Sequence, residues 1–279
     1  NVTFLPFISK LKKILSCKVY LETHDFFTDL TLRTDINTSK KLRQQRFERK
    51  YIPTLDGVFC LMDSQIELYR QYYPNTRFIL ARTGLTKFRV DKKRNERDSL
   101  GYIGSLDIHK GVRNIFSIAS MTKTKPPVIV IGAKSKAEKE RFIEEASKLY
   151  DSSKVSVYLW QDKKSLLELM NRMKLGFVTL EDTFFNQYLT SPLKLFDYYS
   201  KQIPVVGTKI GTLSELVRDG STGYLYSIGS EKEIAEKIDK LYSDDELYAS
   251  IQDNIDKFCD ELTWDVRAKV IAEEISKSN

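Results

Sequence analysis

The sequence is poor in residues that bind metals or form cross-links. Its 279 residues include only three cysteines and two histidines. Cys17, Cys60 and Cys259 are odd in number, far apart and without metal-ligand spacing, which excludes a disulfide scaffold and a cysteine-type zinc site. We therefore expect buried or inert thiols in a reducing, cytoplasmic compartment. The sequence has no His/Cys cluster and no Asp-x-Asp pair, so we predict no metal site.

Long apolar runs are also missing. No run approaches the roughly 18 residues that a membrane-spanning helix needs, and we recognise no secretory signal. Internal repeats and low-complexity stretches are absent as well. With 279 residues, 41% of them hydrophobic, the chain has enough material for one large or two ordinary globular domains.

Acidic residues are scarce in the front third of the chain. Residues 1–99 hold 20 Lys and Arg against 11 Asp and Glu, a net charge of +9, whereas residues 100–279 hold 25 against 27, a net charge of −2. The front third therefore either meets an anionic membrane or acceptor, or carries solvated lysine-rich helices. The sequence has no aromatic-basic RNA motif, so we expect no nucleic-acid partner.

From residue 98 onward, short β-branched runs alternate with amphipathic helical patterns. This alternation is typical of a parallel sheet with helices on both faces, so we predict an α/β fold with a doubly wound sheet. The predicted strands cover 99–103, 127–131, 155–159, 175–180, 204–207 and 223–226, and the predicted helices cover 112–121, 136–149, 164–172, 192–201, 213–217, 231–242, 245–258 and 264–276.

The first 89 residues predict part of a second α/β unit, and the highly charged stretch 90–98 predicts a linker. One feature is a helix over 8–15 with an apolar face and three lysines, Lys10, Lys12 and Lys13. Such a helix packs on the sheet, which we favour, or lies on an anionic membrane. The predicted strands of this part cover 18–23, 57–62 and 77–81, and the predicted helices cover 8–15, 39–51 and 64–72.

The segment 191–208 has the most specific local pattern. Ser191 can cap a helix that begins at Pro192, which leaves the amides of Leu193 and Lys194 at the positive end of the helix dipole. An anion such as phosphate would bind there. Leu193 and Phe196 are expected to face the core, and Asp197 follows about one and a half turns into the helix.

Two sequence blocks resemble the nucleotide-sugar site of retaining GT-B glycosyltransferases, in particular glycosyltransferase family 4. The block 102–112 is similar to the family's Gly-Arg-Leu-x-x-x-Lys-Gly loop. The resemblance covers nearly all of 98–279. Its second block is carried by Ser191-Pro-Leu-Lys-Leu-Phe-Asp197, Pro204-Val-Val206, Leu213-Ser-Glu-Leu-Val217, Asp219-Gly220 and Thr222-Gly223, with 263–268 similar to the family's closing helix.

The resemblance implies a GT-B-like arrangement of Rossmann-like sheets. We expect a partial acceptor-side domain over 1–89, a linker over 90–98, a complete nucleotide-sugar domain over 99–262 and a C-terminal helix over 263–279 that packs back toward the N-terminal domain. A complete first domain of this fold opens with a strand and a Gly-rich turn, neither of which is present. We therefore expect the chain to lack roughly the first third of a normal enzyme.

The resemblance also assigns the donor diphosphate to the two blocks. Lys110 is its leading cation, in a loop that begins at Gly104, and Lys194 is the second candidate because Ser105 stands where the family usually has arginine. Each lysine has the alternative of an exposed, solvated side chain. The negative charge of the leaving diphosphate would then be neutralised by fixed cations and amides rather than by a metal.

Other residues are candidates for binding the nucleoside and the acceptor. Asp197 matches the second acid of the family's Glu-x7-Glu motif and is expected on the ribose hydroxyls, whereas the first acid falls at Leu189. Trp160 and Gln161 fall where the nucleobase binds, although a buried core tryptophan is the alternative. His24, after a predicted strand, faces the transferred sugar and acceptor or is a structural group. Other polar candidates near the sugar are Thr190, Ser191, Glu181, Asp182, Asn186 and Gln187.

We therefore predict a retaining, metal-independent glycosyltransferase. It would move a sugar from a nucleoside diphosphate donor, UDP or GDP, to a glycan, glycolipid or protein acceptor. We expect it in the cytoplasm, with the inner face of the membrane as a further partner. One alternative is a glycosyltransferase-like subunit that binds donor without catalysis, and another is a GT-B sugar-nucleotide epimerase, for which the sequence supplies no placed acid/base carboxylates.

Overall fold

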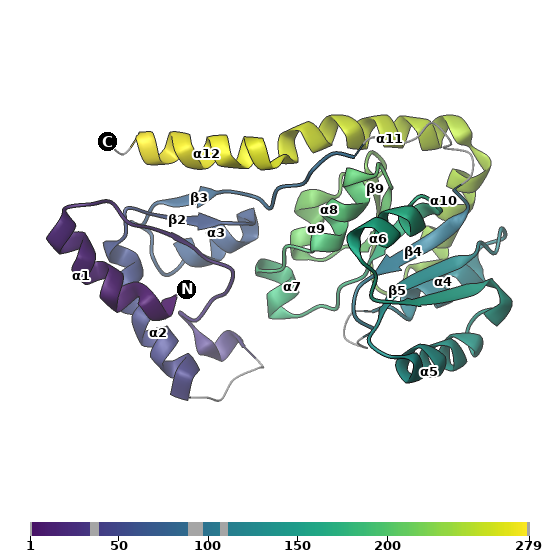
Figure 1. Ribbon diagram of the computed structural model, residues 1–279, viewed down its shortest axis with the longest axis horizontal. Coiled ribbons are helices and arrows are strands. Elements are labelled where there is room, and N and C mark those ends of the chain that lie inside the picture. Colours follow the sequence, from purple (N-terminus) through teal and green to yellow (C-terminus); the bar gives the residue numbers. More distant parts are fainter. Residues whose placement is uncertain (1, 34–38, 89–96, 107–110, 278–279) are drawn as a thin grey trace. The chain divides into compact units, whose positions relative to one another are not determined.

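The computed structural model describes residues 2–33, 39–88, 97–106 and 111–277, and the chain forms two compact units (Figure 1). Unit 1 comprises the described residues of 1–83, 182–191 and 264–279. Unit 2 comprises those of 84–181 and 192–263. Each unit has its own parallel sheet and its own core.

The sheet of unit 2 has six parallel strands in the order β6-β5-β4-β7-β8-β9. Counted from β4, this is the 3-2-1-4-5-6 order of dinucleotide-binding folds, so the predicted doubly wound sheet is confirmed. In such sheets ligands bind at the carboxyl ends of the strands where the order reverses, which here is between β4 and β7. The strands are β4 (Ser99–Ile103), β5 (Val128–Ala133), β6 (Val155–Leu159), β7 (Met173–Val178), β8 (Val205–Thr208) and β9 (Gly223–Tyr226).

Helices cover the unit 2 sheet, and its inner strands are buried along their whole length. Burial on both faces explains why these strands read as continuous apolar runs in the sequence. The helices agree with the predicted ranges to within two residues at nearly every end. They are α4 (Asn114–Met121), α5 (Lys136–Ser147), α6 (Lys163–Met170), α8 (Leu193–Ser200), α9 (Gly211–Leu216), α10 (Glu231–Ser243) and α11 (Asp245–Cys259), with short 3-10 turns at Ser152–Lys154 and Asp260–Leu262.

Unit 1 is built on three parallel strands, β1 (Tyr20–Glu22), β2 (Gly57–Cys60) and β3 (Phe78–Leu80), in that order. The C-terminal helix belongs to this unit, and its Val270 and Ile271 pack against Phe59 and Ile79 of the sheet (Figure 1). The helices are α1 (Leu5–Leu15), α2 (Ser39–Tyr51), α3 (Asp63–Arg70), α7 (Phe184–Tyr188) and α12 (Trp264–Ser276), with 3-10 turns at Val2–Phe4, Leu30–Leu32 and Ile52–Thr54.

Helix α1 differs from the expectation that its apolar residues face the sheet. Phe7, Ile14 and Leu15 are 60%, 75% and 64% exposed, and only Leu5 of this helix is buried. The thiols of Cys60 and Cys259 are buried, whereas that of Cys17 is exposed. No helix within the described ranges is both long and apolar enough to cross a membrane.

Candidate functional site

Two loops meet at the carboxyl edge of the unit 2 sheet, where the strand order reverses. One follows β4 and the other follows β7. Gly111 closes the first loop with a φ of +60°, and a Cβ added to it would lie 3.0 Å from the side chain of Thr179 in the second. The hydroxyl of Thr208 on β8 accepts from the Leu180 amide and donates to the Leu180 carbonyl, both at 2.9 Å, which fixes the start of the second loop.

The backbone at the end of β4 is packed unusually closely. Gly104 and Gly132 have φ values of +143° and +144°, which residues other than glycine rarely adopt. A Cβ on Gly132 would fall 1.9 Å from the carbonyl oxygen of Gly104. Gly132 therefore lets the first turn of the loop lie directly on β5, a close approach of the kind that phosphate-binding turns require.

Lys194, on the first turn of α8, reaches this loop. Its Nζ lies 3.8 Å above the centre of the Tyr102 ring, and a Cβ added to Gly104 would be 2.9 Å from the same atom. The ring face favours a cation at this position. The two sequence blocks, about ninety residues apart, are thus brought together at one ammonium group.

The start of α8 corrects two predictions. Ser191 does not cap the helix, because its hydroxyl is bonded at 2.8 Å to the hydroxyl of Thr83; the N-cap is Pro192, and no side chain caps the helix. Leu193 does not face the core and is 66% exposed, whereas Phe196 is buried as predicted. The helix still begins with amides that have no side-chain cap, at the positive end of its dipole.

Tyr198 holds α8 against β4, a role that the sequence did not suggest. The side chain is fully buried, and its hydroxyl accepts from the Ile103 amide at 3.0 Å and donates to the Gly101 carbonyl at 3.2 Å. The last residues of β4 are therefore tied directly to the helix that carries Lys194 and Asp197. The partners lie 95 and 97 residues away in the sequence, so no local pattern could have revealed this contact.

Asp197 lies on the helix turn that follows Lys194. Its side chain is exposed, yet the protein atoms around it displace enough water to raise the pKa of the carboxyl. The positive charge of Lys163, at the start of α6, acts in the opposite direction. An exposed carboxylate beside a lysine remains able to accept hydrogen bonds from two hydroxyl groups.

Trp160 and Gln161 follow β6 at the same edge of the sheet. The alternative of a buried core tryptophan is wrong, because Trp160 is 54% exposed, with its amide bonded to the Ala133 carbonyl. Gln161 is half-buried and donates to the Leu159 carbonyl at 2.8 Å. Ser105 is half-buried, and its carbonyl accepts from the Tyr102 hydroxyl. The predicted cation Lys110 lies outside the described residues.

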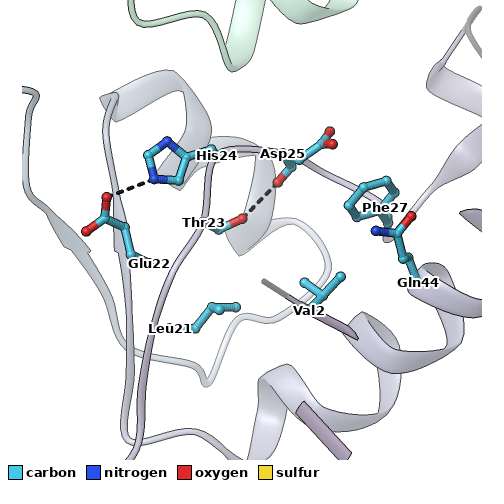
Figure 2. A pocket seen from close by; sticks show the side chains of 8 residues that line it. All are labelled: Val2, Leu21, Glu22, Thr23, His24, Asp25, Phe27 and Gln44. Atoms are coloured by element: carbon cyan, nitrogen blue, oxygen red, sulfur yellow. Dashed lines mark hydrogen bonds and ion pairs between the residues drawn. The ribbon is translucent and has the colours of Figure 1, made fainter. Parts of the chain in front are cut away.

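In unit 1, His24 lies two residues beyond β1 beside a pocket of about 250 Å³ (Figure 2). Its side chain is 64% exposed, and Nε2 lies 2.8 Å from a carboxylate oxygen of Glu22. The other oxygen of Glu22 accepts from Arg267 of α12 at 2.7 Å. An ionised carboxylate only accepts, so Nε2 of His24 is the donor in this contact, and in the neutral tautomer with this proton Nδ1 is an acceptor. The pocket is lined by Val2, Leu21, Glu22, Thr23, His24, Asp25, Phe27 and Gln44.

The segment 182–191 belongs to unit 1 and contains the short helix α7, which was not predicted. Thr183 caps it by accepting from the Asn186 amide. Thr190 donates to the Asn186 side chain at 2.8 Å, and Gln187 donates to Asp182 at 2.7 Å, so these polar candidates are bonded to one another. Leu189 is 4% exposed and belongs to the core of unit 1, where a carboxylate would lose most of its contact with water.

The part of the chain that the structure describes has no cluster of side chains that could hold a metal ion. No three His, Cys, Asp or Glu side chains come together there in a suitable arrangement. Among the described residues, the charges at the carboxyl edge of the unit 2 sheet include those of Lys194, Asp197 and Lys163, to which the dipole of α8 adds.

Comparison with known proteins identifies the family of the chain. The family described as Glycosyl transferases group 1 matches residues 85–258. The capsular polysaccharide biosynthesis glycosyltransferase CapM of Staphylococcus aureus is 26% identical over 180 residues, 61% of this chain and 45% of that protein. The chitobiosyldiphosphodolichol beta-mannosyltransferase of Candida albicans is 26% identical over 135 residues, 47% of this chain and 29% of that protein. The chain thus spans less than half the length of either relative.

Among solved structures, Anabaena HepE in complex with UDP is similar in fold. The TM-score is 0.77 at 17% sequence identity, over 99% of this chain and 77% of that one. This likeness confirms the predicted GT-B-like α/β fold. Since the matched family region, 85–258, covers more than half of the chain, the chain belongs to the glycosyl transferases of group 1.

Proposed function

We propose that the protein transfers a sugar from a nucleoside diphosphate donor, UDP- or GDP-linked, to a glycan, lipid-linked or protein acceptor, with retention at the anomeric carbon. The observation that carries the proposal is the position of Lys194 beside Gly104, at the reversal point of the unit 2 sheet. A cation, a close-packed glycine turn and a helix start together form a site suited to a diphosphate.

Different residues of unit 2 bind the diphosphate, the ribose and the base of the donor. Lys194, with Lys110, neutralises the charge that develops on the leaving diphosphate, and the first amides of α8 donate to its oxygens. Asp197 accepts from the two ribose hydroxyls. Trp160 offers an exposed ring for stacking on the base, and Gln161 lies beside it. No metal is needed for this charge balance, because the cations are built into the chain.

The acceptor side belongs to unit 1. The pairing of His24 Nε2 with Glu22 leaves Nδ1 to accept a hydrogen bond from a sugar hydroxyl. The link from Glu22 to Arg267 orients the carboxylate and therefore the ring. HepE has been solved with UDP-glucose, and TarM with UDP and fondaparinux, which fits a nucleotide-sugar donor and a glycan acceptor for this chain too.

A donor-binding subunit without catalysis is the second candidate. Two positions favour it: Ser105 replaces the arginine expected in the loop, and Leu189 replaces the first acid of the motif and is buried in the core. Incubation with UDP- and GDP-sugars distinguishes the two functions. Slow release of free sugar or transfer to an added acceptor supports the enzyme, whereas tight binding without turnover supports the subunit.

Asp197→Asn tests the ribose assignment. The change keeps the size but removes the charge, so the affinity for UDP or GDP should fall by about 1–2 kcal/mol. Partial loss of water around the exposed side chain raises the pKa of Asp197, so the ionised carboxylate slightly lowers folding stability at neutral pH, and this effect disappears as the pH falls below 3.8, the pKa of the unfolded state. The variant should therefore fold as well as the parent at pH 7. Calorimetric titration and thermal unfolding measure the two effects.

The pH dependence of binding gives a second result for Asp197. Parent affinity should fall as the pH is lowered toward the raised pKa of the carboxyl, and this dependence should be lost in Asp197→Asn. Glu236→Gln removes an exposed carboxyl from α10 and serves as the control. Equal nucleotide affinity in the parent and Asp197→Asn would show that Asp197 does not contact the ribose.

We also propose that the protein works in the cytoplasm at the inner face of an anionic membrane, which presents the acceptor. The apolar residues Phe7 and Ile14 of α1 are exposed together with Lys10 and Lys13. Lys12 is different, because its Nζ lies 2.7 Å from Asp56. Lys10→Gln with Lys13→Gln should therefore weaken binding to anionic vesicles by about 1 kcal/mol per charge and leave nucleotide affinity unchanged.

Co-sedimentation with vesicles checks this result. Binding of the parent should also fall as salt rises to physiological strength, where the Debye length is about 8 Å. The double change Lys232→Gln with Lys237→Gln, on α10 of unit 2, removes the same charge elsewhere and should leave vesicle binding as it was. Equal loss of binding in both double variants would contradict a specific role for α1.

A further inference from the structure

Glu48 is the only buried residue of α2. The helix is otherwise strongly basic, with Lys and Arg at six of its 13 positions, yet its one acid is completely inaccessible to solvent. A buried carboxyl group needs hydrogen-bond partners, because burial without them costs several kcal/mol. The identity of those partners indicates what the residue does.

Within the described part of the chain, the hydrogen bonds to Glu48 come from neutral donors. Oε2 accepts from the Phe27 amide at 2.7 Å and from the Thr28 hydroxyl at 2.8 Å. Oε1 accepts from the Tyr69 hydroxyl at 3.1 Å. The carboxyl thus bridges α2, α3 and the segment that follows β1.

These bonds hold the backbone on both sides of His24. Phe27 and Thr28 follow it by three and four residues. The Tyr69 hydroxyl also lies 2.8 Å from the Asp25 carbonyl and 3.1 Å from the Thr23 hydroxyl. The segment 23–28 is therefore attached to a single buried network with Glu48 at its centre, while the ring of His24 remains exposed beside the pocket (Figure 2).

We propose that Glu48 is a positioning residue that clamps the segment 23–28, and with it His24, and that the clamp is tighter when the carboxyl group carries a proton. The importance of His24 for the acceptor rests on the proposed function. The clamp itself rests only on the contacts within unit 1.

The two charge states use the same atoms differently. When Glu48 is ionised, its Oε1 accepts a hydrogen bond from the Tyr69 hydroxyl. The Asp25 carbonyl then accepts only from the Thr23 hydroxyl. When solvent supplies a proton to Oε1, Oε1–H donates to the Tyr69 oxygen, and Tyr69 donates to the Asp25 carbonyl. These polar groups are all bonded in the protonated state, and the buried carboxyl group of Glu48 then carries no charge. The ionised state retains a buried charge without a bonded cation, which weakens it.

The surroundings of Glu48 also favour its protonated state. Burial raises the pKa of Glu48 to about 7, the nearby carboxylate of Asp25 adds to the rise, and the three hydrogen bonds oppose it. Asp25 is itself paired with Arg33 at 2.6 Å, and Arg49 on α2 donates to the Thr28 carbonyl. The other titratable neighbours stay neutral, because burial raises the pKa of Tyr69, Tyr73 and Cys60.

Hydrogen exchange of the full chain, followed by mass spectrometry on the peptide that contains residues 23–28, tests the clamp. After correction for intrinsic exchange rates, the opening constant of this segment should rise about tenfold per pH unit from pH 5 to pH 7 and then level off. In Glu48→Gln the opening constant should be independent of pH. Glu67→Gln, which removes an exposed carboxyl from α3, should behave like the parent.

Thr28→Val provides a second variant that keeps the charge. The Thr28 hydroxyl donates to the carboxylate and so favours its ionised form. Its loss should raise the levelling point, which is the pH at which the opening constant stops rising. A purely structural contact would not produce this shift. The proposal is overturned if Glu48→Gln keeps the pH dependence of the parent, or if Thr28→Val leaves the levelling point unchanged. Neither measurement requires sugar transfer, so failure here is distinct from failure of the proposed function.

Discussion

Gly132→Val should destabilise unit 2 by about 3 kcal/mol or more and abolish nucleotide binding. Two costs add at this position. The φ of +144° is strained for any residue with a side chain, and the new Cβ would fall 1.9 Å from the Gly104 carbonyl. The backbone must shift, and the turn that we assign to the diphosphate shifts with it. Urea unfolding monitored by circular dichroism, with calorimetric titration of UDP, measures both effects.

Gly220→Ala distinguishes the cost of an unfavourable φ from the cost of a steric clash. Gly220 also has a positive φ, +76°, but a Cβ there would meet no atom within 4 Å. We expect a loss of about 1 kcal/mol and no change in nucleotide affinity. If Gly132→Val were as mild as Gly220→Ala, the close packing of the β4 turn on β5 would be wrong.

Lys194→Ala should weaken the binding of UDP and GDP by about 1.5–3 kcal/mol, or roughly 10- to 150-fold in dissociation constant. The ammonium group lies beside Gly104 and supplies a charge-assisted bond to the diphosphate in our account. Its contact with the Tyr102 ring holds it there before the ligand arrives. Uridine, which has no phosphate, should bind the parent and the variant equally, and calorimetry with both ligands checks the assignment.

Lys232→Ala is the matched control for this result. Lys232 is an exposed lysine of α10, and its loss changes the net charge of the protein by the same amount. An equal loss of UDP affinity in both variants would point to long-range attraction rather than to a contact with the diphosphate.

The strands of unit 2 could be predicted from short apolar runs, which suit the fully buried inner strands β4, β5, β7 and β8, whereas the edge strand β6 is only partly buried. The strands at 99–103, 155–159 and 223–226 agree with β4, β6 and β9 at both ends. Each is a short β-branched or aromatic run between polar residues, and each lies in a parallel sheet that needs apolar residues at successive positions. Because these apolar runs alternate with helical patterns, the order of strands and helices could be predicted from the sequence.

Contacts between distant segments could not be predicted. Ser191 has the local pattern of a cap, but the hydroxyl of Thr83, 108 residues earlier, competes for it. Leu193 has the spacing of a core residue, yet it lies on the exposed turn at the start of α8. Tyr198 is adjacent to the predicted Asp197, but its role depends on β4. These outcomes depend on tertiary packing, which overrides local preference.

The most direct test of our account is the thermal unfolding of the chain with and without UDP and GDP. We predict that one of them stabilises the protein, by about 2.7 kcal/mol at 100 times its dissociation constant, and that Lys194→Ala needs a higher nucleotide concentration for the same effect. If neither nucleotide, at concentrations up to 10 millimolar (roughly 100 times a dissociation constant of 0.1 mM), changed the unfolding temperature, the assignment of the unit 2 site to a nucleoside diphosphate would be contradicted.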